Sequence, residues 1–146
     1  MINRIFNAEG AEVTQKSQKE DKIENDFTRD IIGAAVEVQR VLGVGLLESA
    51  YMAALALELA ERKIQFAQEV PISGNYKGKT LGVAYRADLI VERSVIVEVK
   101  AVESITPVHR SQLLSYLRLS GLKLGLLINF HGFPVVKYVH RVVNKL

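Results

Sequence analysis

Three ionisable side chains interrupt two apolar, β-branched runs in the middle of the chain. Asp88 lies in the first run, residues 80–92, and Glu98 and Lys100 lie in the second, residues 95–102. Such runs are typical of strands packed on a core, where an unpaired charge is costly. Two carboxylates brought together would also repel each other, and a hard divalent cation relieves that repulsion through oxygen ligands. The pattern therefore predicts a metal-binding hairpin with an adjacent lysine.

Whether the two carboxylates meet depends on the turn between the runs. Alternation along a strand places Glu98 and Lys100 on one face. A three-residue connection at residues 92–94 would pair Asp88 with Glu98, whereas a two-residue turn would move Asp88 to the opposite face. The connection lacks the Asn-Gly or Asp-Gly pair that two-residue turns favour. We therefore expect an odd connection, with the two Cβ atoms about 5 Å apart.

This arrangement predicts a Mg²⁺ site that would also accept Mn²⁺. Asp88 and Glu98 would supply carboxylate oxygens, and the backbone carbonyl of Val99 could be a third ligand, with water or phosphate completing the octahedron. Lys100 could steady an attacking water or the charge that develops on a phosphoryl group. A bound metal would polarise the phosphate and lower the pKa of coordinated water. The alternative interpretation is a strand whose solvated face carries a Glu–Lys pair.

Two predicted helices carry side chains that could assist. Glu48 shares a helical stripe with Tyr51, so it either faces inward, towards the metal site or Lys100, or turns to solvent as a helix-start glutamate. Gln112 and Tyr116 lie four residues apart on the helix after the lysine strand. They could orient the lysine or contact a phosphate, or they could simply form the flank of that helix.

Periodicity and turn residues outline the elements that must position these side chains. We predict the order ααβββαββ. The helices are expected near residues 26–42, 46–63 and 107–121, and the strands near residues 68–76, 80–92, 95–102, 124–130 and 135–143. Residues 1–25 are polar, mixed in charge and without an apolar period, which predicts a flexible or weakly ordered leader before a single domain at residues 26–146.

Composition narrows the class of protein. Among 146 residues, 49% are hydrophobic and none is cysteine, which excludes disulfides and thiolate metal sites and fits a cytoplasmic setting. The longest apolar stretch contains Glu48 and Glu58, so we expect no membrane span. Residues 1–30 carry a net charge of −2 and residues 31–146 a net charge of +5. The basic part is compatible with a polyanionic partner and also with ordinary solubility.

The order of these residues resembles that of the PD-(D/E)XK nuclease superfamily. The likeness lies in Glu48, Asp88, Glu98-Val99-Lys100 and Gln112…Tyr116, and the Gln-x-x-x-Tyr helix is similar to that of its RecB-like branch. The run Gly45-x-x-Glu48-x-x-Tyr51 is similar to the signature of the small bacterial GxxExxY proteins, which are assigned to that superfamily. The resemblance covers about residues 26–144. The proline that the superfamily carries near the aspartate is absent, since Ala87 precedes Asp88.

The resemblance implies an α/β (α+β) fold with a restriction-endonuclease-like core, a central mixed β-sheet flanked by helices. It implies Asp88 and Glu98 as metal ligands, assisted by the Val99 carbonyl, with Lys100 as the catalytic lysine. It also implies Glu48 as an added acidic group and Gln112 and Tyr116 as supports carried by a helix.

We therefore expect a Mg²⁺-dependent nuclease that hydrolyses phosphodiester bonds by metal-activated water, with DNA preferred to RNA as its partner. The alternative is a non-catalytic nucleic-acid-binding or protein-interaction module that retains the nuclease fold. A chain of this size covers little nucleic acid alone, so a homo-oligomer is a further expectation. Leu46, Met52 and Leu57 could supply its interface.

Overall fold

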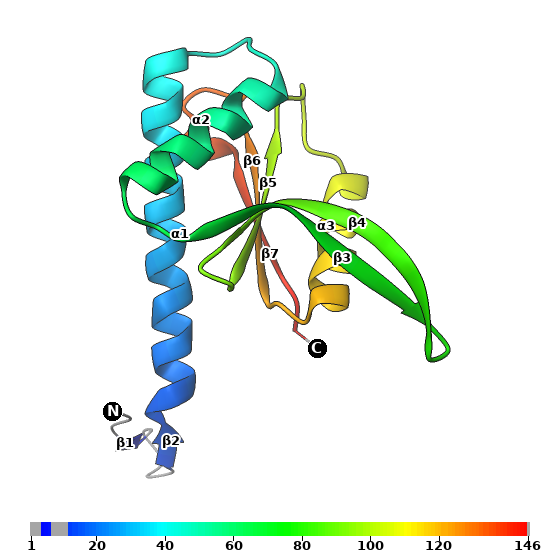
Figure 1. Ribbon diagram of the computed structural model, residues 1–146. Helices are drawn as coiled ribbons and strands as arrows, with labels where there is room; N and C mark the ends of the chain where they lie inside the picture. The colour runs from blue at the N-terminus through cyan, green and yellow to red at the C-terminus, as the bar shows by residue number, and fades with distance from the viewer. Residues whose placement is uncertain (1–3, 7–11, 146) are drawn as a thin grey trace.

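A computed structural model describes residues 4–6 and 12–145 of the chain, with side chains from residue 27 onward (Figure 1). Its elements, in chain order, are β1 (Arg4–Phe6), β2 (Glu12–Thr14), α1 (Gln15–Leu42), α2 (Glu48–Glu61), β3 (Phe66–Tyr76), β4 (Lys79–Val91), β5 (Val95–Lys100), α3 (Pro107–Ser120), β6 (Leu124–Asn129), the 3-10 helix η1 (Val135–Tyr138) and β7 (Val139–Val143).

The main sheet is mixed and has the strand order β3-β4-β5-β6-β7. Neighbouring strands are antiparallel except β5 and β6, which are parallel and are joined by the crossover helix α3. The predicted α+β fold, with helices on both faces of a mixed sheet, is confirmed. None of the helices in the described part of the chain has the length and apolar character needed to traverse a bilayer.

Two predicted elements differ from the structure. Helix α1 begins at Gln15 instead of near residue 26, because residues 15–25 are rich in Lys, Glu and Gln, which extend a helix readily. Residues 1–3 and 7–11 of the predicted leader lie outside the described residues, and the domain boundary stays a prediction. The strand expected at residues 135–143 begins only at Val139, since Val135 donates its N–H to the side chain of Gln39 and η1 follows.

The two faces of the sheet bury different residues of β5. Val95, Val97 and Val99 pack on the side covered by α1 and α2, together with buried residues such as Leu55 and Leu59. On the opposite face Ile96 packs beneath α3, against Leu113 and Leu117. Since side chains alternate along a strand, Glu98 and Lys100 belong to the face covered by α3.

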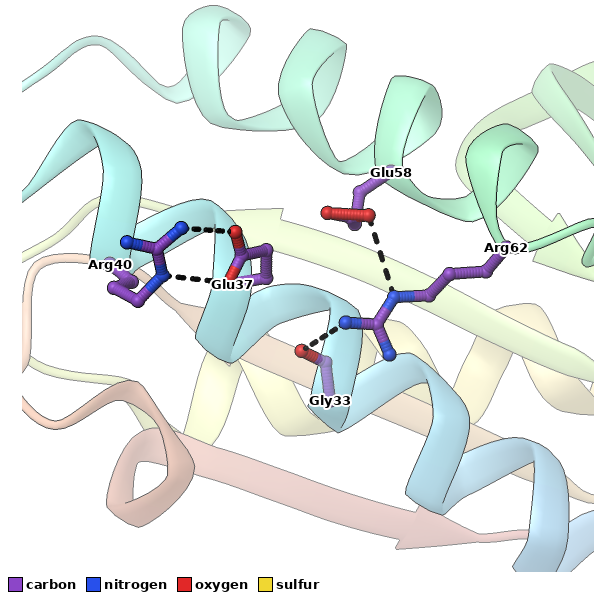
Figure 2. A network of polar contacts seen from close by, with 5 residues as sticks. All are labelled: Gly33, Glu37, Arg40, Glu58 and Arg62. Carbon is purple, nitrogen blue, oxygen red and sulfur yellow. Dashed lines mark hydrogen bonds and ion pairs between the residues drawn. The ribbon is translucent and has the colours of Figure 1, made fainter.

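A polar network joins the end of α2 to α1 (Figure 2). The Arg62 guanidinium bonds Glu58 on its own helix at 3.5 Å and donates to the backbone carbonyl of Gly33 at 3.3 Å. A Cβ atom at position 33 would lie 3.1 Å from the Arg62 guanidinium, so a small residue there leaves room for this contact. A neighbouring pair, Arg40 and Glu37, lies within α1. Exposed pairs of this kind contribute little energy, so apolar packing holds the two helices.

Buried amide side chains organise the end of the sheet where Lys100 lies. Gln39 donates to the carbonyls of Phe130 and Gly132. Asn129, at the end of β6, accepts from the N–H of Val102 and donates to its carbonyl. The segments that leave β5 and β6 are therefore held by side-chain amides, which can satisfy backbone groups where the ladder ends.

Helix α3 has well-defined ends. Thr106 is its N-cap and Pro107 follows, while the His109 ring accepts from the Thr106 N–H at 3.0 Å. Gly121 ends the helix with φ 75°. Both predicted ends are confirmed.

Candidate metal centre

The hairpin of β4 and β5 has the register that the carboxylate pair requires. Leu89 pairs with Val97 and Val91 with Val95, and the same register places Asp88 opposite Glu98. The connection is the three residues 92–94, so the predicted odd connection is confirmed. The two acidic side chains are therefore neighbours across the end of the ladder.

Each carboxylate accepts a hydrogen bond from the backbone of the other strand. Asp88 Oδ2 accepts from the N–H of Val99 at 2.9 Å, and Glu98 Oε1 accepts from the N–H of Asp88 at 3.3 Å. The residue-to-residue ladder between the strands runs only from Val91 to Leu89, so beyond it side-chain oxygens take the place of backbone carbonyls. The N–H and C=O of a strand residue point to the same side, so the Val99 carbonyl faces this gap as well.

Tyr85 completes the bonding of Glu98. Its hydroxyl donates to Glu98 Oε2 at 2.5 Å. Its ring stacks on that of Tyr116 from α3, with centroids 3.3 Å apart and planes 6° from parallel. Tyr116 is thereby held beside the carboxylate pair, and the crossover helix is tied to β4.

Sequence reasoning assigned no role to Tyr85, which strict alternation would put on the face opposite Asp88. In the structure both Tyr85 and Ala87 pack on the α3 face, and Leu89 packs on the other. The alternation breaks at Asp88, whose partner position on β3 is Glu69, with the left-handed value φ 51°. The only sequence signal for a role of Tyr85 was its position three residues before Asp88. An argument from strand periodicity alone would not include it in the site.

Burial raises the pKa values of both carboxyl groups, and a neighbouring negative charge adds to the shift at each. Glu98 is 3% exposed, and desolvation, followed by the charge of Asp88, raises its pKa to about 8. Desolvation also raises the pKa of Asp88, to which the charge of Glu69 adds, while the Val99 N–H and Lys100 oppose the shift. Desolvation and the negative charge of Glu98 raise the pKa of Tyr116. With both groups ionised the pair would carry more negative charge than its surroundings balance, so the metal-free protein favours a protonated Glu98.

The donor set fits a hard divalent cation. Two carboxylates and one backbone carbonyl are oxygen ligands of the type that Mg²⁺ and Mn²⁺ prefer, and Mg²⁺ keeps several waters at such sites. Across the described residues, no three acidic or histidine side chains gather as a metal cluster. The protein would therefore supply few ligands, and the remaining positions would be left to water or substrate.

Lys100 follows Glu98 by two residues and lies on the same face of β5, half-buried. Its charge acts on both carboxyl groups. Within the described residues its ammonium group has no ion pair or hydrogen bond, so its N–H groups are available to bond a ligand.

Glu48 and Gln112 are exposed, and in the described part of the chain no contact joins either of them to the carboxylate pair. Glu48 is exposed as the first residue of α2, so the solvent-facing orientation holds, and no contact joins it to Lys100 in the described part of the chain. It lies one turn before Tyr51, whose ring stacks on Phe130 at the Lys100 end of the sheet. Gln112 is exposed on α3, one turn before Tyr116 and thus about 6 Å from it along the helix axis.

Comparison with known proteins gives a match to one family model. The family model of the PD-(D/E)XK nuclease superfamily matches residues 25–142, most of the chain and all of the candidate centre. The mixed sheet and three helices are consistent with a restriction-endonuclease-like fold. No curated protein matches the chain, and no solved structure matches it.

Proposed function

Because this chain belongs to the PD-(D/E)XK nuclease superfamily, we propose that it is a Mg²⁺-dependent nuclease, with Mn²⁺ as a substitute, that hydrolyses phosphodiester bonds in DNA. One observation carries the proposal. The carboxylates of Asp88 and Glu98 each accept a hydrogen bond from a backbone N–H of the other residue's strand, and Lys100 lies on the same face of β5 as Glu98. Buried carboxylates with raised pKa values beside a lysine suit the hydrolysis of a phosphate ester.

Each residue of the candidate centre has a proposed role in this reaction. A divalent cation held by Asp88, Glu98 and the Val99 carbonyl would polarise the phosphate and lower the pKa of a nearby water. Lys100 would hold the attacking water and offset the negative charge that gathers on the phosphoryl oxygens. The water would give up a proton as its oxygen bonds to phosphorus, the P–O ester bond would break, and the departing oxygen would take up a proton, so that the number of protons is unchanged. Tyr116 would donate to a phosphate oxygen.

Two further residues have weaker support. Gln112 would orient Lys100 or a phosphate from its place one turn before Tyr116. Glu48 would add a carboxylate at the Lys100 end of the sheet, which requires its exposed side chain to turn towards a bound substrate. Substrate binding often tightens geometry that is loose in the free enzyme, so both roles are compatible with the positions observed.

The finer parts of the proposal rest on the sequence. The Gly45-x-x-Glu48-x-x-Tyr51 run supports membership of the GxxExxY proteins, and the Gln112…Tyr116 spacing supports the RecB-like branch. The absence of cysteine supports a cytoplasmic location. A nuclease domain at residues 26–146 and a homo-oligomer complete the proposal.

The first prediction tests Lys100 directly. Lys100→Ala should lower the rate of DNA cleavage by roughly 10²–10³-fold, the usual cost of removing one group that stabilises developing charge. The measurement is cleavage of single- and double-stranded DNA and RNA with Mg²⁺ or Mn²⁺. Lys137→Ala, an exposed lysine on η1, is the matched control and should leave the rate unchanged.

Equal rates for the wild type and Lys100→Ala would remove the catalytic claim. That result would favour the non-catalytic module that keeps the nuclease fold. Cleavage that persists without divalent cations would contradict the metal dependence while leaving the nuclease assignment in place.

A further inference from the structure

The distal part of the β3–β4 hairpin extends beyond the main sheet as a two-stranded ribbon (Figure 1). Strand β4 pairs with β5 only from Leu89 onward, so residues 73–83 pair only with each other. Large side chains are exposed there: Tyr76 is 61% exposed, Leu81 65% and Val83 53%. A paired but uncovered ribbon of this kind is a candidate contact surface.

Charge is distributed unevenly between this side of the molecule and the α1–α2 side. Residues 70–86 contain Lys77, Lys79 and Arg86 and no acidic residue, and α3 adds two arginines and no acidic residue. The helical segment at residues 27–63 instead contains five acidic and four basic residues. Positive charge is therefore concentrated on the elements around the candidate metal centre, which favours a polyanion on that side.

The tip of the ribbon is a tight turn. Lys77 and Gly78 have φ 49° and φ 78°, and Tyr76 pairs with Lys79 across them, as in a two-residue turn with both central residues left-handed. The Lys77 ammonium lies 5.3 Å from the centre of the Tyr76 ring. The turn therefore presents both lysines at the tip of the ribbon.

We propose that the ribbon at residues 73–83 binds the phosphate backbone of duplex DNA, with Lys77 and Lys79 as its phosphate contacts. The proposal rests on the nuclease function proposed above and assigns its substrate a binding surface. A two-stranded ribbon fits the major groove of B-DNA, whereas the major groove of duplex RNA is too deep and narrow. One aromatic side chain provides too little stacking surface for a single strand.

The ribbon and the candidate centre belong to one continuous strand. Lys79 and Asp88 both lie on β4, nine residues apart, so at about 3.3 Å per residue they are separated by no more than about 30 Å. One turn of B-DNA spans about 34 Å. One helical turn of duplex DNA is therefore long enough to span the distance between the carboxylate pair and the ribbon tip.

The test is fluorescence anisotropy with a labelled DNA duplex in EDTA, so that binding is measured without cleavage. The variant is Lys77→Asn with Lys79→Thr, because Asn suits the left-handed turn and Thr suits a strand, so the fold is kept while both charges are removed. The slope of log K against log salt should become shallower by roughly 2, since each phosphate contact contributes about 0.9. Thermal unfolding checks that the variant is folded.

The matched control is Lys123→Asn with Lys145→Thr, two exposed lysines at the opposite end of the sheet. It should bind duplex DNA with the salt slope of the wild type. Equal slopes for the two double variants would overturn the ribbon proposal even when the wild type cleaves DNA. A wild type that neither binds nor cleaves DNA would overturn the nuclease proposal as well.

Two further results would show which molecule binds the ribbon. Weaker binding of single-stranded DNA or duplex RNA, compared with duplex DNA, supports the proposed contact with duplex DNA, and tighter binding of either contradicts it. A ribbon variant that binds DNA like the wild type but changes oligomeric state in light scattering would assign the ribbon to a protein contact and overturn the proposal.

Discussion

At the scale of single residues, we expect Glu98 to make the largest contribution to the pH dependence of stability in the metal-free protein. Its side chain is 3% exposed and lies against another carboxyl group, so burial and the charge of Asp88 raise its pKa from 4.5 to about 8. The folded state therefore holds a proton over a range in which the unfolded chain has already lost it. Unfolding releases that proton, so the free energy of unfolding decreases as pH rises through this range.

The second prediction follows from this decrease in the free energy of unfolding with rising pH. In the absence of divalent cations, the free energy of unfolding should fall as pH rises from about 4.5 to about 8 and then level off. Denaturant titration at a series of pH values with EDTA measures the effect. Glu98→Gln should flatten most of this slope, with a residual slope from Asp88, whose pKa is raised in the same direction.

Glu103→Gln is the matched control, because Glu103 is exposed in the segment after β5. It should keep the slope of the wild type. A wild-type stability that rises or stays constant across this pH range would show that Glu98 is not held in its neutral form, contrary to the geometry of the pair.

Tyr85 has the largest role among the residues that sequence reasoning missed. Its hydroxyl bonds Glu98 and its ring stacks on Tyr116, so one side chain joins β4, β5 and α3 at the candidate centre. Hydrogen bonds to charged groups contribute more than neutral ones, which gives this contact its greatest effect when Glu98 is ionised.

At the scale of elements, the distance between α3 and β6 sets where Tyr116 lies. A Cβ atom at Gly125 would be 2.8 Å from three atoms of the Leu113 side chain, which is too close for both to stay in place. The glycine therefore lets the crossover helix approach the sheet. That approach is needed for α3 to bring Tyr116 against Tyr85.

The third prediction is that Gly125→Ala will destabilise the protein by about 1–3 kcal/mol, as overpacking of a buried contact does. It should also lower nuclease activity, since the displaced helix moves Tyr116. Denaturant unfolding and cleavage assays measure the two effects.

The double variant Gly125→Ala with Leu113→Ala is the control. The smaller side chain makes room for the added methyl group, so the double variant should be more stable than the sum of the two single changes predicts. Strict additivity would show that the two residues are not in contact.

At the scale of the whole molecule, a cation bound at the candidate metal centre would stabilise the fold. Its donors come from β4 and β5, and unfolding separates them. A cation that binds only the folded state stabilises it by about 2.7 kcal/mol at a hundredfold excess over its dissociation constant.

The fourth prediction is that Mg²⁺ or Mn²⁺ raises the unfolding temperature of the wild type in a concentration-dependent way. The effect should be larger above pH 8 than at pH 6, because bound carboxylates must be ionised. Asp88→Asn should abolish it, and Asp30→Asn, an exposed aspartate on α1, should not. An equal metal response in the two variants would show that the cation binds elsewhere.

Much of the fold followed from the sequence alone, for local physical reasons. Pro107 and Gly121 predicted the ends of α3 because their backbone preferences act without tertiary help. The β-branched runs predicted β4 and β5, and the lack of a two-residue turn signal predicted the connection that pairs Asp88 with Glu98.

Long-range packing decided the rest. Strict alternation excludes Tyr85 from the site, but in the structure its hydroxyl bonds Glu98, and the partner position of Asp88 on β3 is the left-handed residue Glu69. Helical spacing left two orientations open for Glu48, and the packing of α2 on the sheet chose the exposed one. Strands were expected near residues 68–76 and 80–92, but the extension of β3 and β4 past β5 as a free ribbon depends on where the neighbouring strand ends. The periodicity of the sequence indicates which side chains share a face of a helix or strand. Which residues pack against that face is determined by contacts between elements that are distant in the chain.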